Sequence, residues 1–241
     1  MCNKELNHII ETSNNIVFFG GAGVSTESSI PDFRSETGLY TTKNNFSYPP
    51  EVMLSHSFFI NHPEDFFDFY RSKMIYKEAK PNPAHYALAE LEKIGKIKAV
   101  ITQNIDGLHQ MAGSKKVLEL HGSIHRNYCT KCKKFFDLDY ILNSKTTIPK
   151  CDVCGETIKP DVVLYEEGLN IDIINESVEF ISNADVLIVG GTSLVVYPAA
   201  GLIDYFKGKK LILINKASTP YDVKADLVIN DSIGKVLKNT L

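Results

Sequence analysis

Four cysteines near the middle of the chain have the spacing of a metal site. They form two Cys-x-x-Cys pairs, Cys129 with Cys132 and Cys151 with Cys154, and eighteen residues separate the pairs. This spacing is typical of a zinc ribbon, in which each pair supplies two thiolates to one tetrahedral Zn²⁺. Because four thiolates leave no coordination position for water, we predict one zinc ion with a structural rather than a catalytic role. The alternatives are a pair of redox disulfides or four unrelated buried thiols.

A glycine-rich turn near the N-terminus is a candidate site for a phosphate group. Residues 16–19 form a short apolar segment, and three glycines, Gly20, Gly21 and Gly23, follow it within four residues. Glycines between a strand and a helix let main-chain N–H groups approach a pyrophosphate. The third glycine of the G-x-G-x-x-G pattern is missing, because Thr26 occupies that position. Taken alone, the turn is equally compatible with ordinary strand-to-helix turn chemistry.

Four further apolar segments are also followed by glycine or polar side chains. Turn chemistry explains any one of these clusters, but it does not explain five of them together. In an open α/β sheet the carboxyl ends of the strands meet at one edge, where ligands bind. We therefore predict one long ligand groove. The side chains that follow the four segments are Gln103, Asn104 and Asp106, then His121, then Gly191, Thr192 and Ser193, and finally Asn215.

Short apolar, β-branched segments recur along the chain and predict the strands of a sheet. Near-continuous apolar strands of this length are typical of a parallel sheet that is buried on both faces. Helical patterns occur at residues 84–94 and 198–206, and the N-terminal residues resemble the start of a helix. We predict an α/β fold with a Rossmann-like, doubly wound parallel sheet. The predicted strands are residues 16–19, 99–102, 117–120, 162–165, 186–189, 211–214 and 227–229.

Two stretches interrupt the alternation of strands and helices. Residues 35–80 have no strand pattern and are rich in aromatic side chains, which predicts a helical insertion. Residues 124–158 carry the four cysteines and are predicted to be a zinc-binding insertion. We expect the two insertions to form a smaller module on a single domain that spans residues 1–241. The large Rossmann-like part would then comprise residues 1–34, 81–123 and 159–241.

Composition excludes several classes of protein. A formal net charge of −3 argues against a general nucleic-acid binder, which would carry a basic excess. No apolar run approaches the eighteen residues that a membrane-spanning helix requires, and the first residues lack the apolar stretch of a signal peptide. Cysteines in zinc spacing are more typical of a reducing compartment than of an oxidising one. We therefore expect a cytoplasmic protein that binds neither nucleic acid nor membranes.

The motifs, in their order along the chain, resemble the sirtuin family of NAD-dependent protein deacylases. The resemblance covers nearly the whole chain and is closest to a bacterial-like, minimal catalytic core. It implies NAD-dependent removal of acetyl or other acyl groups from protein lysines, which yields nicotinamide, O-acyl-ADP-ribose and free lysine. The motifs are Gly21-Ala22-Gly23-Val24-Ser25, Ile30-Pro31-Asp32-Phe33-Arg34, Thr102-Gln103-Asn104-Ile105-Asp106-Gly107-Leu108-His109, His121-Gly122, the two cysteine pairs, and Gly191-Thr192-Ser193-Leu194.

The resemblance also implies roles for individual residues. Asn104 and Asp106 would hold the nicotinamide end of NAD⁺, because an amide and a carboxylate offer the donor and acceptor that a carboxamide requires. Phe33 would shield the reacting ribose carbon from water. His121 would act as the general base on a ribose hydroxyl, and His109 is expected to pack in the interior. The NAD⁺ contacts implied are Gly21, Ala22, Gly23, Thr26, Asp32, Phe33, Arg34, Tyr40, Gln103, Asn104, Ile105, Asp106, His121, Gly191, Thr192, Ser193, Asn215, Lys216 and Ser232.

An acyl-lysine protein would bind as an extended peptide between two loops, at Val163 and Tyr165 and at Val195. Tyr165-Glu166-Glu167 replaces the commoner Phe-Gly-Glu of the family, so we expect an altered preference for peptide sequence. Family members that prefer succinyl or malonyl groups carry Tyr-x-x-Arg, and the corresponding residues here would be Tyr70 and Lys73. Because an ammonium group cannot form the bidentate pair with a carboxylate, we expect acetyl-lysine to be the better substrate. The alternative is that Lys73 is simply solvated on a helix surface.

Three other functions are compatible with parts of the sequence. An NAD-dependent oxidoreductase would require the missing third glycine and an acidic residue about twenty positions later, and neither is present. A non-enzymatic zinc-ribbon module would leave the groove motifs unexplained. Mono-ADP-ribosyl transfer would use the same cofactor, but Asn104, Asp106 and His121 together favour deacylation.

Overall fold

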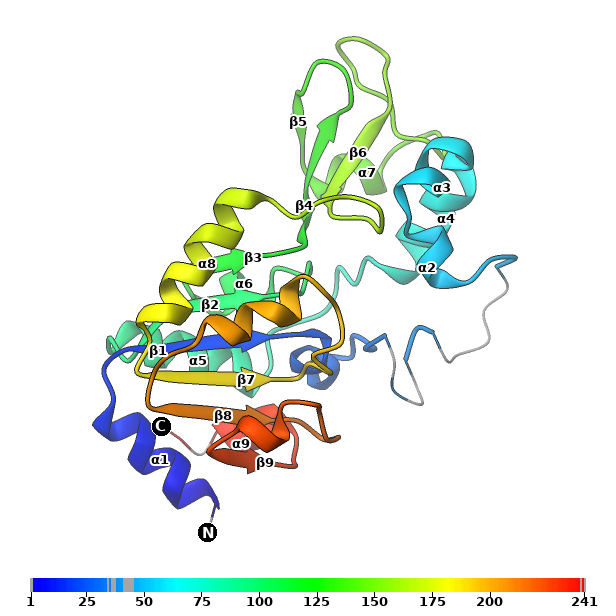
Figure 1. Cartoon of the computed structure of the whole chain (residues 1–241). Coiled ribbons are helices and arrows are strands. Elements are labelled where there is room, and N and C mark those ends of the chain that lie inside the picture. The colour runs from blue at the N-terminus through cyan, green and yellow to red at the C-terminus, as the bar shows by residue number, and fades with distance from the viewer. Residues whose placement is uncertain (1, 34, 36–37, 41–45, 239, 241) are drawn as a thin grey trace.

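The computed structural model describes residues 2–33, 35, 38–40, 46–238 and 240. Its largest element is a six-stranded sheet in the order β3-β2-β1-β7-β8-β9, in which every neighbouring pair is parallel (Figure 1). This arrangement confirms the predicted doubly wound sheet, since the strand order reverses between β1 and β7. The strands are β1 (Ile16–Gly20), β2 (Ile97–Thr102), β3 (Val117–Glu119), β7 (Val186–Gly190), β8 (Lys210–Ile214) and β9 (Leu227–Ile229).

Alternate residues of the central strands pack into two separate cores, one on each face of the sheet. Phe18 of β1 belongs to one core, whereas Val17 and Phe19 belong to the other. This division follows from the two-residue period of a strand. The first core is closed by helices α1 (Cys2–Thr12), α5 (Pro83–Lys93), and α9 (Ile233–Leu237), and the second by α8 (Ile171–Asn183) and the 3₁₀ helix η3 (Ala199–Tyr205).

The residues at the start of α5 explain why a helix begins there. Asn82 caps α5 by accepting a hydrogen bond from the Ala84 amide at 2.9 Å, and Pro83 occupies the first helical position. The segment predicted at 198–206 forms a 3₁₀ helix instead of an α-helix. The short α6 (Leu108–Ala112) follows β2, and the 3₁₀ turns η1 (Ala22–Val24), η2 (Thr26–Ser28) and η4 (Asp222–Lys224) lie in loops. No helix among the described residues is both long and apolar enough to span a bilayer.

The prediction of a parallel strand at residues 162–165 is wrong. The strand there is β6 (Ile158–Val162), and it belongs to a separate antiparallel sheet with β4 (Gly122–Cys129) and β5 (Phe135–Phe136). Beyond β6, the Tyr165 amide donates to the Leu54 carbonyl at 3.0 Å. The apolar pattern marks a buried extended segment, but it does not specify which sheet the segment joins.

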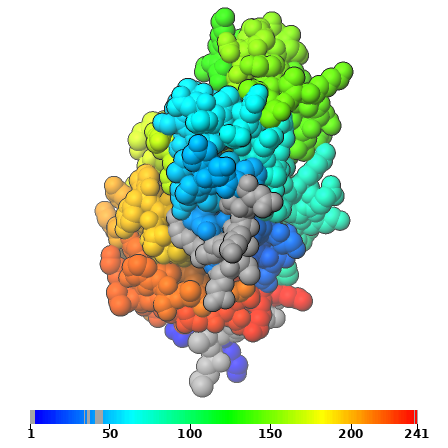
Figure 2. Space-filling model, turned by 90° about the vertical axis from the view of Figure 1, so that its right-hand side faces the viewer, coloured from blue at the N-terminus to red at the C-terminus, as the bar shows by residue number. Residues whose placement is uncertain are grey.

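The helical segment and the antiparallel sheet share one apolar core. Helices α2 (Pro50–Met53), α3 (His56–Asn61) and α4 (Pro63–Lys73) contribute their aromatic residues to this core, and the antiparallel sheet contributes Ile124 and Val162. The short α7 (Leu138–Leu142) lies against β4. The helical segment (cyan) and the antiparallel sheet (green) lie next to each other at the end of the molecule far from the N-terminus (Figures 1 and 2).

Candidate active site

The carboxyl ends of the parallel strands bring the predicted polar clusters to one edge of the sheet. The Gln103 amide donates to the Gly20 carbonyl at 3.0 Å, and the Gly21 amide donates to the Gly190 carbonyl at 3.2 Å. The Asn215 amide bonds in the same way to the Ile229 carbonyl at 3.1 Å. Residues far apart in the sequence therefore meet at this edge, where an open α/β sheet binds its ligand.

The glycines of the first turn are required by a close approach of two loops. The Gly23 amide donates to the Gly191 carbonyl at 2.8 Å, and a Cβ added to Gly23 would lie 2.7 Å from the Gly191 Cα. Gly191 itself has φ +62°, and a Cβ there would overlap the Val24 amide. Thr26 donates its hydroxyl to the Gly23 carbonyl at 3.0 Å, so it stabilises the turn at the position of the missing third glycine.

Asn104 and Asp106 are joined by a side chain for which no role was predicted. The Ser25 hydroxyl donates to Oδ2 of Asp106 at 2.6 Å and accepts from Nδ2 of Asn104 at 3.0 Å. Burial raises the pKa of Asp106, and the donors from Ser25 and the Leu108 amide oppose that rise. Ser25 is itself buried. Its position directly after the glycine turn is the one signal in the sequence that could have indicated it.

The ring of His121 is held by a hydrogen bond at one of its two nitrogens. Its Nδ1 lies 3.0 Å from the Gln103 carbonyl oxygen, which can only accept, so Nδ1 carries a proton and the lone pair of the neutral ring is on Nε2. Burial lowers the pKa of His121, although the Gln103 carbonyl opposes this. Gly122 follows at φ +75°, where a Cβ would overlap the Asp161 carbonyl oxygen. The ring is therefore suited to accept a proton at neutral pH.

The far side of the edge carries a buried donor that has no hydrogen-bond partner in the part of the chain that the structure describes. Oδ1 of Asn215 accepts from the Thr192 amide at 2.9 Å, and the Thr192 hydroxyl accepts from Nε2 of Gln103 at 3.1 Å. Nδ2 of Asn215 is buried without a hydrogen-bond partner among the described residues. A buried unpaired amide is costly, so this nitrogen fits a ligand that supplies an acceptor. Ser193 and Lys216 are exposed beside it.

The segment with Phe33 lies against the module core. The rings of Phe33 and Tyr40 meet edge to face with 5.4 Å between centroids, and the Tyr40 amide donates to the Phe33 carbonyl at 2.9 Å. Both rings and Ile105 pack on that core. The Asp32 carbonyl accepts from the Leu39 amide at 2.8 Å. Of the predicted NAD⁺ contacts, Arg34 lies outside the described residues.

The remaining predicted residues differ in their surroundings. The Val163 amide donates to the His121 carbonyl at 3.0 Å, which brings one proposed peptide loop to the predicted base. Tyr165 and Val195 are 41% and 48% exposed, so both can contact a peptide. Ser232 directly precedes α9, where its amide donates to Asp231 at 2.8 Å.

Tyr70 is not on a surface in this structure. It is fully buried and stacks on Phe66 at 5.8 Å, and burial, together with the charge of Asp161, raises its pKa. Its hydroxyl has no hydrogen-bond partner among the described residues. Lys73 is half-buried at the end of α4. Their role in acyl selectivity stays a prediction.

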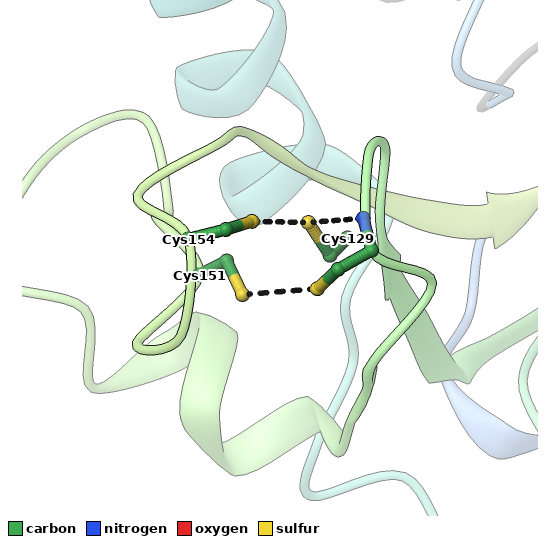
Figure 3. Close-up of side chains that lie close together, drawn as sticks. Cys129, Cys151 and Cys154 are labelled. Atoms are coloured by element: carbon green, nitrogen blue, oxygen red, sulfur yellow. Dashed lines mark hydrogen bonds between the residues drawn. The ribbon is translucent and has the colours of Figure 1, made fainter.

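The four cysteines converge on one point, as Figure 3 shows for the two facing loops. All four Sγ atoms lie within 4.8 Å of one another. The closest pairs, Cys129 with Cys154 at 3.4 Å and Cys132 with Cys151 at 3.6 Å, are far longer than a disulfide bond of about 2.05 Å. Four convergent thiols fit one structural zinc ion, and the disulfide alternative does not describe this geometry.

Known proteins resemble this chain over nearly its full length. The model of the Sir2 family matches residues 21–198. An NAD-dependent protein deacetylase of Clostridium tetani is 74% identical over 97% of this chain and 95% of its own length, and one of Clostridium acetobutylicum is 73% identical over 99% and 97%. A solved complex of a Sir2 protein with a peptide and NAD⁺ is 42% identical, with a TM-score of 0.86, over 99% of this chain and 96% of its own. A complex with a deacetylated peptide and acetyl ADP-ribose is 40% identical, with a TM-score of 0.91, over 99% and 97%.

Proposed function

Because this chain belongs to the Sir2 family and is an NAD-dependent protein deacetylase, we propose that the strand-end edge is its active site and that His121 is the general base. The observation that carries this proposal is the state of His121. Its Nδ1–H is bonded to the Gln103 carbonyl, which leaves Nε2 free to take a proton from a ribose hydroxyl.

The other residues of the edge fit NAD⁺ as a co-substrate. When bound, NAD⁺ supplies a bond between ribose and nicotinamide whose cleavage makes the ribose carbon electrophilic. Asn104 and Asp106, held together by Ser25, present an amide and a carboxylate to the nicotinamide carboxamide. The unpaired Nδ2 of Asn215 offers a donor to the adenosine end. Phe33 covers the reacting carbon and keeps water away from it.

The protein substrate binds as an extended peptide with its acyl-lysine directed toward His121. The loop at Val163 and the loop at Val195 would hold the peptide main chain, a mode of recognition that depends little on peptide sequence. The exposure of Tyr165 and Val195 supports this arrangement. The thiols of a zinc site favour a reducing compartment, which supports a cytoplasmic location.

Peptide-dependent release of nicotinamide tests this function. We expect the purified protein to release nicotinamide from NAD⁺ in proportion to an added acetyl-lysine peptide, with O-acetyl-ADP-ribose and the free-lysine peptide as the other products. Liquid chromatography with mass detection would measure all three, and the matched unacetylated peptide is the control. Equal nicotinamide release with both peptides would contradict the proposal.

Lys73 provides a prediction about the acyl group. We expect the wild-type protein to have a higher kcat/KM for an acetyl peptide than for the succinyl form of the same peptide, because a lysine at this place lacks the bidentate fork of arginine. Lys73→Arg should raise kcat/KM for the succinyl peptide by roughly tenfold, which corresponds to one charge-assisted hydrogen bond. Lys93→Arg, on the exposed end of α5, is the matched control. A wild-type preference for succinyl, or no gain from arginine, would show that Lys73 does not contact the acyl group.

A further inference from the structure

The loop after β6 is joined to the cofactor side of the active site by a pair of tyrosines. The hydroxyl oxygens of Tyr165 and Tyr40 lie 2.7 Å apart, within hydrogen-bond distance. Tyr40 in turn packs edge to face on Phe33 and bonds its amide to the Phe33 carbonyl. A continuous series of contacts therefore leads from the peptide loop to the side chain that covers the reacting carbon.

Tyr165 can exert this influence because its own main chain is fixed. Its amide donates to the Leu54 carbonyl and its carbonyl accepts from the His56 amide, both at 3.0 Å. The next residue, Glu166, has φ +75°, a conformation that is unfavourable for a residue with a side chain. Its carboxylate accepts from the Ser57 amide at 2.8 Å and the Ser57 hydroxyl at 2.6 Å, which offsets that strain and holds the loop on α3.

Glu167 attaches the same loop to its flanks. Its Oε1 lies 2.8 Å from Nδ1 of His56, and its Oε2 accepts from Nζ of Lys159 and from the Leu164 amide, both at 3.0 Å. Although burial by itself raises the pKa of Glu167, these donors lower it below its ordinary value. These hydrogen bonds fix the main chain on both sides of Tyr165. The Tyr165 ring, which is partly exposed, reaches Tyr40 from this fixed position.

We propose that Tyr165 is a positioning residue, which acts through Tyr40 to hold Phe33 over the ribose carbon. This inference rests on the proposed function of the strand-end edge and adds a residue to it. The peptide loop and the water-excluding side chain would then be coupled by one hydroxyl–hydroxyl hydrogen bond. The Tyr165-Glu166-Glu167 sequence was expected to alter the preference for peptide sequence. Under this proposal it also affects the position of Phe33 at the cofactor.

The proposal has a chemical consequence for the fate of NAD⁺. Once the bond to nicotinamide breaks, the acyl oxygen of the peptide and a water molecule compete for the same ribose carbon. Attack by water replaces nicotinamide with a hydroxyl group and gives ADP-ribose with release of a proton. Attack by the acyl oxygen instead joins the acetyl group to the ribose; one water molecule is then consumed, the bond from acetyl to the lysine nitrogen breaks, and O-acetyl-ADP-ribose and the free lysine ammonium are released. If Tyr165 positions Phe33, then loss of the Tyr165 hydroxyl admits water and raises the share of ADP-ribose.

The test is the product ratio of Tyr165→Phe, which removes one oxygen and keeps the ring. With NAD⁺ and an acetyl-lysine peptide, we expect the ratio of ADP-ribose to O-acetyl-ADP-ribose to rise roughly two- to tenfold, the range that corresponds to one hydrogen bond. A change in folding stability alone would lower the amount of active protein without altering this ratio. Tyr86→Phe, an exposed tyrosine on α5, loses the same atom and should keep the wild-type ratio.

A double-mutant cycle distinguishes a direct link from two separate effects. Tyr40→Phe should reproduce the ratio of Tyr165→Phe, and the double variant should exceed neither by more than about twofold, because one bond is lost in all three. An unchanged ratio in Tyr165→Phe, or effects of the two single variants that multiply in the double, would overturn the proposal. A wild-type protein that forms no O-acetyl-ADP-ribose would instead refute the proposed function, and this inference with it.

Discussion

His121→Ala is expected to lower the rate of deacetylation at least about 10²-fold, because it removes the only group proposed to take the ribose proton. The fold should persist, since His121 lies in the turn between β3 and β4 and, among the described residues, its side chain hydrogen-bonds to the Gln103 carbonyl alone. The measurement is kcat/KM for an acetyl-lysine peptide at saturating NAD⁺, together with the melting temperature. His8→Ala, on the exposed face of α1, removes an imidazole away from the strand-end edge and should retain full activity.

The pH dependence provides an independent check of the same assignment. A general base must be neutral, so kcat/KM should be highest at neutral pH and should fall as the pH drops through the pKa of His121. Because burial lowers this pKa, the fall should be centred below the ordinary value of 6.5. The acidic limb should be absent from the residual activity of His121→Ala. Near wild-type turnover in that variant would refute the role of His121 as base.

Removal of the zinc ion is expected to unfold its module. The core beside the metal is small and consists of Phe136, Ile141, Ile158 and two of the cysteines, so few apolar contacts remain if the metal is lost. Binding of a structural zinc is coupled to folding and contributes several kcal/mol or more. We expect one zinc per chain in the purified protein, and a fall of about 10 °C or more in melting temperature for Cys129→Ser or Cys154→Ser.

Activity should be lost in these cysteine variants through disorder rather than through lost chemistry. The zinc content of each variant, measured by elemental analysis, should fall in parallel with its melting temperature. Cys2→Ser removes a thiol outside the two pairs and should retain the metal, the stability and the activity. Stable, active protein without zinc would contradict a structural role for the ion.

Much of the fold could be predicted because its signals are local. The buried strands are nearly continuous apolar runs, and six of the seven predicted strands lie in the parallel sheet. The seventh, at residues 162–165, was assigned to the wrong sheet. Val162 and Leu164 are buried as predicted, but they pack in the core that the helical segment shares with β4, and nothing in the local sequence specifies that partner.

The sequence by itself determined the zinc site, the glycine turn and the polar strand ends, because each depends on residue type and spacing within a few positions. Only the tertiary structure decided that Ser25 joins Asn104 to Asp106, which are about eighty residues further along the chain. It alone decided that Nδ1 of His121 is protonated and that Tyr40 meets Tyr165, 125 residues away. The physical reason is that a hydrogen bond requires two atoms within about 3 Å. For residues so distant in sequence, that distance is set by how the sheets and helices pack.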